Sequence, residues 1–221
     1  MASAIAKGYR GIGMEGSIAR WYEKNTRKDI NQFQELAERL QAGLPVDASI
    51  LEVAPGPGFL AIEMAKLSKF HVTSLEISKT FVELGRKNAV DAGVPVDIHE
   101  GNASAMPFAD NSFDFLVCRA AFKNFSEPVQ ALLEMQRVLR LGGTGVVIDL
   151  RRDTPMSAIQ TYVDGTGMSR FNRLATMLTF RFMLLKRAYT KEEIELMTRQ
   201  VPFRKVEVRN IDIGMEIWFE K

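Results

Sequence analysis

The stretch Leu51–Ala61, which reads LEVAPGPGFLA, decides how the rest of the chain is interpreted. The apolar run Ser49–Val53 predicts a buried strand, and Phe59–Leu67 predicts a helix that starts directly after the glycines. Glycine lets a backbone approach a ligand closely where a Cβ atom would collide with it. The first turn of a helix also offers unpaired N–H groups and the positive end of its dipole. The stretch therefore predicts a strand–turn–helix ligand site at the carboxyl edge of a parallel sheet.

On the C-terminal side of this stretch, short apolar runs alternate with helical segments. Ser78 is a candidate N-cap for a helix that runs to Ala92, and Ser126 for one that ends at Gly142-Gly143. Further strands are expected at His71–Leu75, Val96–Ile98, Phe113–Cys118 and Gly145–Leu150. Strands separated by helices of this length favour right-handed βαβ units. The pattern predicts an α/β fold with a doubly wound, mostly parallel sheet.

The pattern changes after Leu150. Residues 151–188 are expected to be largely helical, and they are followed by a short helix at Lys191–Arg199. Two close β runs, Lys205–Ile213 and Met215–Glu220, predict an antiparallel hairpin at the edge of the sheet. We expect a single domain over residues 1–221, divided into an N-terminal helical arm (1–45), a cofactor-binding core (46–150), a helical lid insert (151–190) and a final helix with a hairpin (191–221).

Composition limits the class of protein. The chain has 221 residues, 46% of them hydrophobic and 25% charged, which is typical of a folded globular protein rather than a disordered one. A formal net charge of +2 does not favour a nucleic-acid binder. One cysteine and two histidines argue against a disulfide and a structural zinc site, so no metal is expected. Neither an apolar run long enough to cross a membrane nor a signal-peptide pattern is visible, which favours a cytoplasmic protein that is not integral to a membrane.

Two acidic residues flank the glycine turn. Glu76 follows Gly58 by 18 residues at the end of the second expected strand, where a carboxylate can accept both hydroxyl groups of a ribose. Glu52 lies inside the strand before the turn, where a carboxylate disfavours a pyrophosphate and favours a cationic or zwitterionic ligand. Gly56 to Ala61 nevertheless matches the dinucleotide pattern G-x-G-x-x-A. A nicotinamide- or flavin-dependent oxidoreductase therefore stays open as an alternative.

Here the sequence resembles the class I S-adenosylmethionine-dependent methyltransferases over roughly residues 48–150. Glu52, Ala54, Gly56 and Gly58 match the family's motif acid-x-G-x-G-x-G, with Ala54 replacing its first glycine. Gly101-Asn102-Ala103 resembles the family's G-D-A segment, in which the Asp side chain reads the adenine amine. Asn102 keeps an amide oxygen that can accept this hydrogen bond. The resemblance implies a Rossmann-like fold, S-adenosyl-L-methionine as cofactor and Glu76 as the ribose ligand.

The resemblance also implies the remaining cofactor contacts. Methyltransferases of this kind close an aromatic residue of the N-terminal arm over the methionine half of the cofactor, and Tyr22 is the candidate, with Trp21 packing on the core. The other cofactor-binding candidates are Pro55, Ile77, Ala103, Cys118 and Arg119. The segment Ala120–Pro128 is similar to one in the ubiquinone and menaquinone C-methyltransferases, with Lys123 and Asn124 standing for an Arg-Asn pair. This short similarity does not carry the substrate with it.

The insert is apolar on two sides. Phe171, Leu174, Ala175, Leu178, Phe182 and Leu185 form one helical stripe, and Met177, Phe180, Arg181 and Leu184 form another. Such a helix is buried on two sides, covers a ligand, or forms a dimer face. The basic residues around it leave a membrane-surface helix as a further alternative. We expect the insert and residues 1–28 to be a mobile cover that becomes ordered on ligand binding.

These observations predict in-line methyl transfer from S-adenosyl-L-methionine to a small, partly apolar molecule. Asp149 and Arg151 end the fifth expected strand and can face the acceptor. No acid–base constellation is legible, so the catalytic residue is left unassigned, as are the acceptor and the oligomeric state. Cys118 is interpreted as a small core residue rather than a nucleophile. A non-catalytic, cofactor-binding partner subunit is the second alternative.

Overall fold

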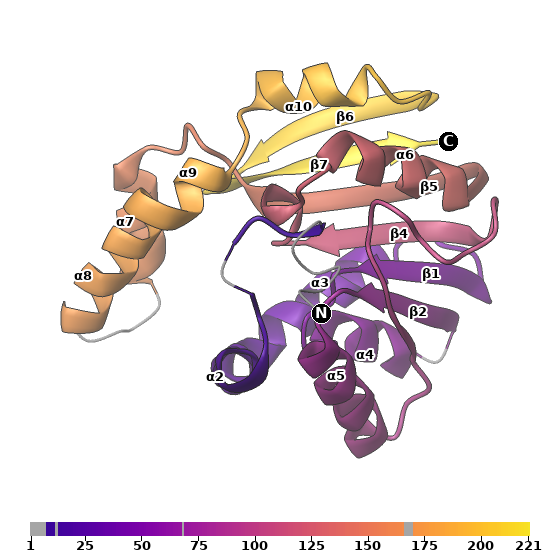
Figure 1. The fold of residues 1–221 in the computed structure, drawn as a ribbon, viewed down its shortest axis with the longest axis horizontal. Coiled ribbons are helices and arrows are strands. Elements are labelled where there is room, and N and C mark those ends of the chain that lie inside the picture. The colour runs from indigo at the N-terminus through magenta and orange to yellow at the C-terminus, as the bar shows by residue number, and fades with distance from the viewer. Residues whose placement is uncertain (1–7, 12, 68, 166–169) are drawn as a thin grey trace, which may run out of the picture.

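The computed structural model describes residues 8–11, 13–67, 69–165 and 170–221, without the side chains of residues 170 and 171. Residues 1–7 and 12 of the expected arm, and the Phe171 side chain of the expected stripe, lie outside the described residues. Figure 1 shows the layered arrangement, with the strands stacked side by side and helices on both faces.

A sheet of seven strands runs through the described part of the chain in the order β3-β2-β1-β4-β5-β7-β6. Its strands are β1 (Ala48–Val53), β2 (Phe70–Glu76), β3 (Asp97–Glu100), β4 (Phe113–Arg119), β5 (Leu139–Leu150), β6 (Lys205–Ile211) and β7 (Gly214–Glu220). The first five strands are parallel, whereas β7 runs antiparallel between β5 and β6. The expected α/β architecture with a C-terminal antiparallel hairpin is confirmed.

Helices cover both faces of this sheet because each strand buries side chains on both sides. On one face α3 (Ile30–Leu40) and α4 (Phe59–Lys66) pack on β1 and β4, with Phe33, Leu60 and Phe115 in one buried cluster. On the other face α6 (Pro128–Val138) and α10 (Lys191–Thr198) contribute a second cluster. The helix α5 (Lys79–Ala92) lies beside α4 and β3. Because helices cover both faces, the central strands are shielded from water. A ligand-binding site is therefore expected at the carboxyl ends of the strands.

The expected N-terminal helical arm begins, among the described residues, with a helix that no apolar periodicity had marked. α2 (Gly16–Thr26) leads through a 3₁₀ turn (Arg27–Asp29) into α3. Glu15 holds α2 against the start of α5, because its carboxylate accepts hydrogen bonds from the backbone N–H groups of Lys79 and Thr80. The expectation that Trp21 packs on the core is wrong: it lies on the outer face of α2 and is 67% exposed.

The insert forms a separate helical unit at the side of the sheet (Figure 1). It contains α7 (Met156–Asp164), α8 (Arg170–Thr179), a π-helical turn (Phe180–Leu184) and α9 (Leu185–Arg187). Ile159, Val163, Phe180 and Leu185 bury one another in a small cluster of their own. The insert therefore has its own apolar core, distinct from the two cores on the faces of the sheet.

Two sequence-based expectations fail for α6, one at each end of the helix. The helix ends at Val138 rather than at the glycine pair, and its N-cap is Glu127 rather than Ser126. Gly142 and Gly143 lie inside β5, in a bulge where the pairing with β4 shifts register. A Cβ on Gly143 would approach the carbonyl oxygens of Arg140 and Phe113 to 2.9 and 3.2 Å. Gly143 therefore lets the backbone of the bulge pack directly against neighbouring carbonyl groups, where a side chain would not fit.

Candidate cofactor site at the carboxyl edge

The glycine turn after β1 is fixed by backbone hydrogen bonds. The N–H of Ala54 donates to the carbonyl oxygen of Leu75 at 2.8 Å, and the side-chain amide of Asn88 donates to that of Pro57 at 2.9 Å. The turn needs left-handed backbone at three positions, since Ala54, Gly56 and Gly58 have φ angles of 57°, 56° and 81°. Glycine adopts this conformation without strain, whereas alanine pays about 1–2 kcal/mol. The replacement of the motif's first glycine by Ala54 therefore stores backbone strain.

Glu76 is part of this turn and not an exposed acid at its mouth. Only 4% of it is exposed, and its two carboxylate oxygens accept hydrogen bonds from the backbone N–H groups of Gly56 and Ser78, each at 2.9 Å. Burial raises the pKa of Glu76 from 4.5 to about 7, against the lowering effect of these hydrogen bonds. Glu76 therefore links the end of β2 to the glycine turn and to the start of α5.

Glu52 is buried to the same degree but is less well paired. The N–H of Ala61 donates to its carboxylate, while its Oε2 atom has no hydrogen-bond partner among the described residues. Burial raises the pKa of Glu52 to about 8, although the Arg119 guanidinium lowers it and the Glu76 charge raises it further. A buried carboxylate with an unpaired oxygen costs free energy until a cation or a donor reaches it. The site thus favours a positively charged group.

A short N-terminal segment, residues 8–11, crosses the carboxyl edge. The N–H of Arg10 donates to the carbonyl oxygen of Asn124 at 2.7 Å, and the carbonyl oxygen of Gly8 accepts from Ser126 at 3.3 Å. A Cβ on Gly8 would lie 2.5 Å from the Ile77 side chain and 3.0 Å from that of Asn102. The segment therefore lies directly on two of the expected cofactor contacts.

Tyr9 of this segment was missed by the sequence analysis. Burial is the main cause that raises the pKa of its phenol, and the charges of Glu76 and Asp149 act in the same direction, whereas Arg187 lowers it. Its backbone pairs with that of Phe125, after β4. No local sequence pattern marks it, because its neighbours come from distant parts of the chain.

Asn102 and Ala103, the candidates for the adenine side, follow directly after β3. The Asn102 side-chain oxygen accepts a hydrogen bond from the N–H of Ser104 at 2.9 Å, so the amide shapes its own turn. Its second lone pair is the one that an adenine amine can use. Ala103 packs partly buried against the sheet core.

At the end of β4, Cys118 and Arg119 differ in environment. Cys118 is fully buried, and burial raises the pKa of its thiol well above the usual value, so the thiol stays protonated. Arg119 stacks its guanidinium over the Phe33 ring, 4.6 Å from the ring centre. An inert thiol fits the interpretation of Cys118 as a core residue.

Lys123 and Asp149 form a buried ion pair at the ends of β4 and β5. The ammonium lies 2.8 Å from one carboxylate oxygen, and the backbone N–H of Lys123 donates to the other at 2.8 Å. Each side chain is only 5% exposed. Asp149 therefore anchors the loop after β4, and it is bound to Lys123 rather than free to face an acceptor.

Tyr22 reaches the glycine turn through an aromatic contact. Its ring meets that of Phe81 edge-on, with the ring centres 5.7 Å apart. The Phe81 ring in turn lies 3.9 Å from where a Cβ of Gly56 would be. Tyr22 is thus separated from the turn by the Phe81 ring.

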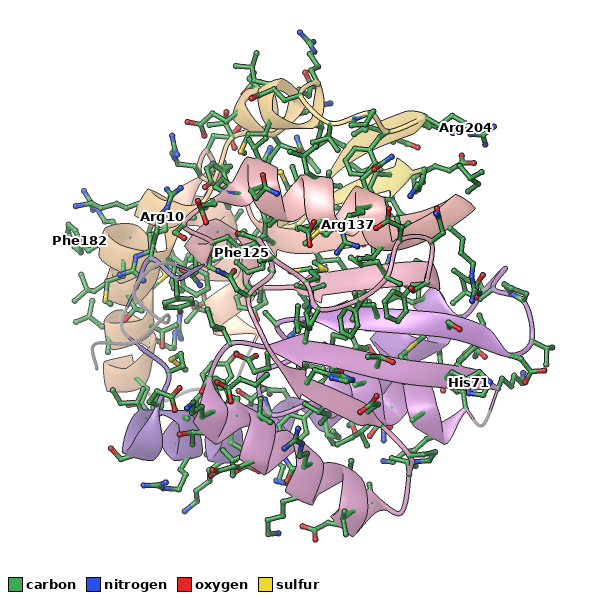
Figure 2. All side chains as sticks on the ribbon, turned by 45° about the vertical axis from the view of Figure 1, so that its right-hand side comes forward. Arg10, His71, Phe125, Arg137, Phe182 and Arg204 are labelled. Carbon is green, nitrogen blue, oxygen red and sulfur yellow. The ribbon has the colours of Figure 1, made fainter. Side chains whose placement is uncertain are left out.

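The insert and the N-terminal segment meet at this edge. A Cβ on Gly11 would come within 2.6 Å of the Tyr9 ring and 2.9 Å of the Arg187 guanidinium at the end of α9. Figure 2 shows Arg10 and Phe125 close together where the segment crosses the strands. Two parts of the chain expected to form a cover are therefore in contact.

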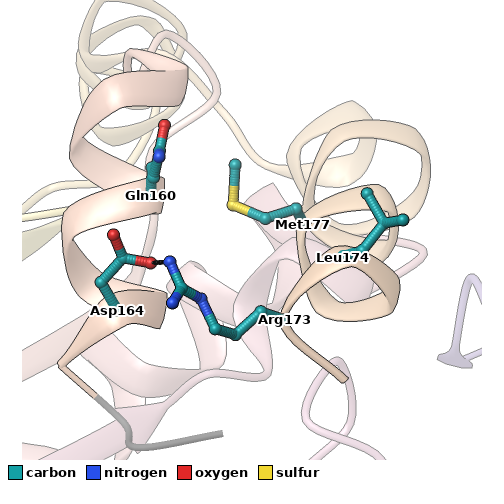
Figure 3. A pocket seen from close by; sticks show the side chains of 5 residues that line it. All are labelled: Gln160, Asp164, Arg173, Leu174 and Met177. Carbon is teal, nitrogen blue, oxygen red and sulfur yellow. Dashed lines mark hydrogen bonds and ion pairs between the residues drawn. The ribbon is translucent and has the colours of Figure 1, made fainter. Parts of the chain in front are cut away.

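Two hollows lie away from the glycine turn. One, of about 360 Å³, lies between α7 and α8 (Figure 3). The other, of about 300 Å³, is on β5, β7 and β6, next to Trp218. Within the described ranges, no helix is long and apolar enough to span a membrane, and no three potential metal-ligating side chains gather.

Comparison with known proteins agrees with this geometry. Residues 51–147 match the family model described as a methyltransferase domain. The ubiquinone/menaquinone biosynthesis C-methyltransferase UbiE of Hahella chejuensis is 35% identical over 118 residues, which are 52% of this chain and 47% of that protein. Its namesake from Roseobacter denitrificans is 27% identical over 176 residues, 75% of this chain and 70% of that protein. The chain thus spans about half the length of the Hahella relative.

A solved structure shares the whole fold. A candidate S-adenosyl-L-methionine-dependent methyltransferase of Methanococcus maripaludis superposes with a TM-score of 0.76 at 19% identity, covering 96% of this chain and 95% of that one. The sheet order, the glycine turn with its two buried acids, and the matched family model lead to one conclusion. Residues 51–147 match a methyltransferase domain, and the chain as a whole is similar in fold to an S-adenosyl-L-methionine-dependent methyltransferase.

Proposed function

We propose that the protein binds S-adenosyl-L-methionine at the glycine turn and transfers its methyl group to a small, partly apolar molecule. The observation that carries this proposal is the pair of buried carboxylates, Glu52 and Glu76, with one oxygen of Glu52 unpaired. A pyrophosphate would make the ionised form of both acids still less favourable, whereas a sulfonium and an ammonium group would stabilise their carboxylates and lower the cost of burying them. The two carboxylates therefore fit this cofactor better than a dinucleotide.

Each candidate residue has a role in this proposal. Glu76 accepts hydrogen bonds from the ribose hydroxyls. The turn lets the cofactor approach the protein backbone closely, and it is formed by Ala54, Pro55, Gly56 and Gly58. The adenine side is formed by Ile77, Asn102 and Ala103. Tyr22 closes over the methionine half, while Cys118 and Arg119 offer backbone contacts at the end of β4. The bound cofactor supplies an activated methyl group. The protein's task is to align the acceptor and exclude water, so no strong base is required for a nucleophilic acceptor.

The acceptor site is proposed at the same edge, beneath residues 8–11 and beside the insert. Phe122 and Phe125 stack edge-on with ring centres 5.5 Å apart, next to the Lys123–Asp149 pair. Apolar rings beside a buried ion pair suit a small molecule with an apolar body and a polar group. Two curated relatives are named for ubiquinone and menaquinone biosynthesis, which agrees with such an acceptor. We propose a cytoplasmic location, with residues 1–28 and 151–188 as the cover.

Calorimetric titration tests the cofactor first. S-adenosylmethionine and its demethylated product are expected to bind in the micromolar range, and NADH is expected to give no heat. Binding of NADH alone would replace the proposal with the oxidoreductase alternative. The acceptor is then sought by transferring a labelled methyl group to a metabolite extract, with products identified by mass. Cofactor binding with no labelled product from any extract would favour the non-catalytic partner subunit.

A further inference from the structure

The insert concentrates positive charge. Residues 165–190 contain no aspartate or glutamate, and their basic residues are Arg170, Arg173, Arg181, Lys186 and Arg187. The whole chain has only a small excess of basic over acidic residues, so acidic residues predominate outside this stretch. A helix with only positive charges on its polar side differs from an ordinary solvated helix, in which both signs alternate.

An apolar stripe runs along the outside of the same helices. Leu174, Leu178 and Phe182 follow one another at intervals of four residues on α8 and the π-helical turn. They are 60%, 47% and 51% exposed, and Met183 beside them is 40% exposed. The inner side of the insert already buries an apolar cluster. The outer stripe is not part of this cluster and does not contribute to the apolar core of the insert.

The cations flank the stripe. The Arg181 guanidinium and the Lys186 ammonium lie 5.4 and 5.8 Å from the centre of the Phe182 ring. Among the described residues, neither cation has a carboxylate partner, whereas Arg173 pairs with Asp164 across the hollow between α7 and α8 (Figure 3). Phe182 is thus an exposed aromatic between two cations. Figure 2 places it at the outer edge of the molecule.

We propose that the outer face of α8 and α9, formed by Leu174, Leu178, Arg181, Phe182 and Lys186, docks on the surface of an anionic lipid bilayer. Apolar side chains enter the boundary between headgroups and acyl chains, and the flanking cations meet the anionic headgroups. Charge of a single sign and exposed apolar residues on one helical face match this surface. A protein partner would need acids of its own in the same arrangement.

The position of this face gives the docking a consequence. Arg187, at the end of the same helices, lies against Gly11: its guanidinium is 2.9 Å from where a Cβ atom of that residue would be. A docked insert therefore holds the bilayer surface beside the segment that covers the candidate site. The inference concerns the surface of the insert alone, and its test uses neither cofactor nor acceptor, so its failure is distinct from a failure of the proposed function.

Vesicle flotation tests the docking. The full chain is mixed with phosphatidylcholine vesicles, with and without a third of phosphatidylglycerol, and should float only with the anionic vesicles. Each cation near the surface contributes about fivefold to the affinity, so Arg181→Glu with Lys186→Glu should lower binding by about 25-fold or more. The triple change Leu174→Ser, Leu178→Ser and Phe182→Ser should lower it by about tenfold or more. High salt should weaken binding of the unmodified protein, because it screens the headgroup charges.

Matched variants control for loss of charge and apolar surface in general. Arg199→Glu with Lys205→Glu, and Leu141→Ser with Leu196→Ser, change exposed residues outside the insert and should leave flotation unchanged. Equal melting temperatures of all variants confirm that each is folded. Three outcomes would overturn the docking: no flotation of the unmodified protein, equal flotation with neutral vesicles, or undiminished flotation of the insert variants. A dimer that the triple change dissociates, with no vesicle binding, would assign the face to a second copy instead.

Discussion

The glycine turn and the helical insert are built on opposite principles. At the turn, polar groups are buried and held in place: Glu76 accepts two backbone hydrogen bonds, and Asn88 holds a carbonyl oxygen. In the insert, a small apolar cluster is buried together with Leu150 and Ile213, while a second apolar stripe faces outward. The turn therefore has a fixed geometry, as a cofactor site requires. The insert keeps its surface available for a neighbour, whether that is an acceptor, the N-terminal segment or a bilayer.

Replacement of Glu76 should produce the largest effect, and it acts on the turn alone. Glu76→Ala leaves two buried N–H groups unpaired, which costs about 2–4 kcal/mol of unfolding free energy. It should also weaken cofactor binding by about 10- to 150-fold through the lost hydroxyl contacts. From the sequence one would expect a shift of only two or three degrees in melting temperature; the buried hydrogen bonds argue for more.

Denaturant melts and calorimetry of Glu76→Ala, Glu76→Gln and Glu83→Ala separate these effects. The glutamine keeps one acceptor and should fall between the wild type and alanine. Glu83 is an exposed carboxylate on α5, and its replacement should change neither quantity. Full affinity in Glu76→Ala would remove this residue from the cofactor site.

A pair of core substitutions tests whether the two regions unfold separately. Leu132, on α6, and Ile159, on α7, are both essentially inaccessible, and truncation to alanine removes similar contacts. Leu132→Ala should lower the global unfolding free energy by about 2–5 kcal/mol. Ile159→Ala should instead speed amide hydrogen exchange across residues 156–164 and 172–187 and change the global value by less than about 1 kcal/mol. Equal global losses would mean that the insert and the sheet unfold as one unit.

Glu52 gives the glycine turn a pH dependence. Folding raises the pKa of Glu52 to about 8 from 4.5, so the folded state favours the neutral acid. The stabilising contribution is complete below about pH 4.5 and is lost as pH rises through 8. The cofactor-free protein should therefore lose on the order of 3 kcal/mol between pH 5 and pH 9. Glu76, with a pKa of about 7, adds a smaller loss of the same sign.

The comparison variant is Glu52→Gln, which cannot titrate. Thermal melts across this pH range should show a flatter profile for the amide than for the wild type. A wild-type melting temperature that rises from pH 5 to pH 9 would show that the buried acid is charged and paired in the folded state.

The smallest effect is expected at Ala54, where the turn holds a strained residue. Its φ of 57° costs an alanine about 1–2 kcal/mol, and glycine removes that cost but loses more chain entropy on folding. Ala54→Gly should thus stabilise the protein by no more than about 1 kcal/mol. Ala65→Gly, inside α4, should destabilise it by about 1 kcal/mol. A loss of stability in both variants would mean that Ala54 is not strained.

The sequence predicted the parts of the fold that depend on local pattern. The strand before the turn, the Ser78 cap and the two-strand hairpin are confirmed because each has a signature within a few residues. The placement of Glu52 and Glu76 at one edge also followed, since parallel strands end together. Their nearly complete burial did not, because burial depends on the arm and on α5 packing over them.

What the sequence did not predict depends on contacts between distant segments. Residues 8–10 pair with residues 124–126, a register that no local pattern encodes. The glycine pair at Gly142 looked like a helix end, and only the pairing of Leu139 with Phe113 and of Thr144 with Phe115 shows that it lies in a bulge. Trp21 was expected to pack because it is aromatic, yet its side of α2 has no neighbour to bury it.

The order β5-β7-β6 has a consequence for synthesis of the chain. β7 is made after β6, yet it lies between β6 and β5 and supplies the antiparallel partner of each. Until residues 214–220 have left the ribosome, β5 presents an open edge of unpaired N–H and C=O groups, and β6 has no neighbour in the sheet. Nascent chains that stall before Gly214 therefore expose a strand edge that can pair with other chains. They depend on chaperones or proteolysis to avoid aggregation.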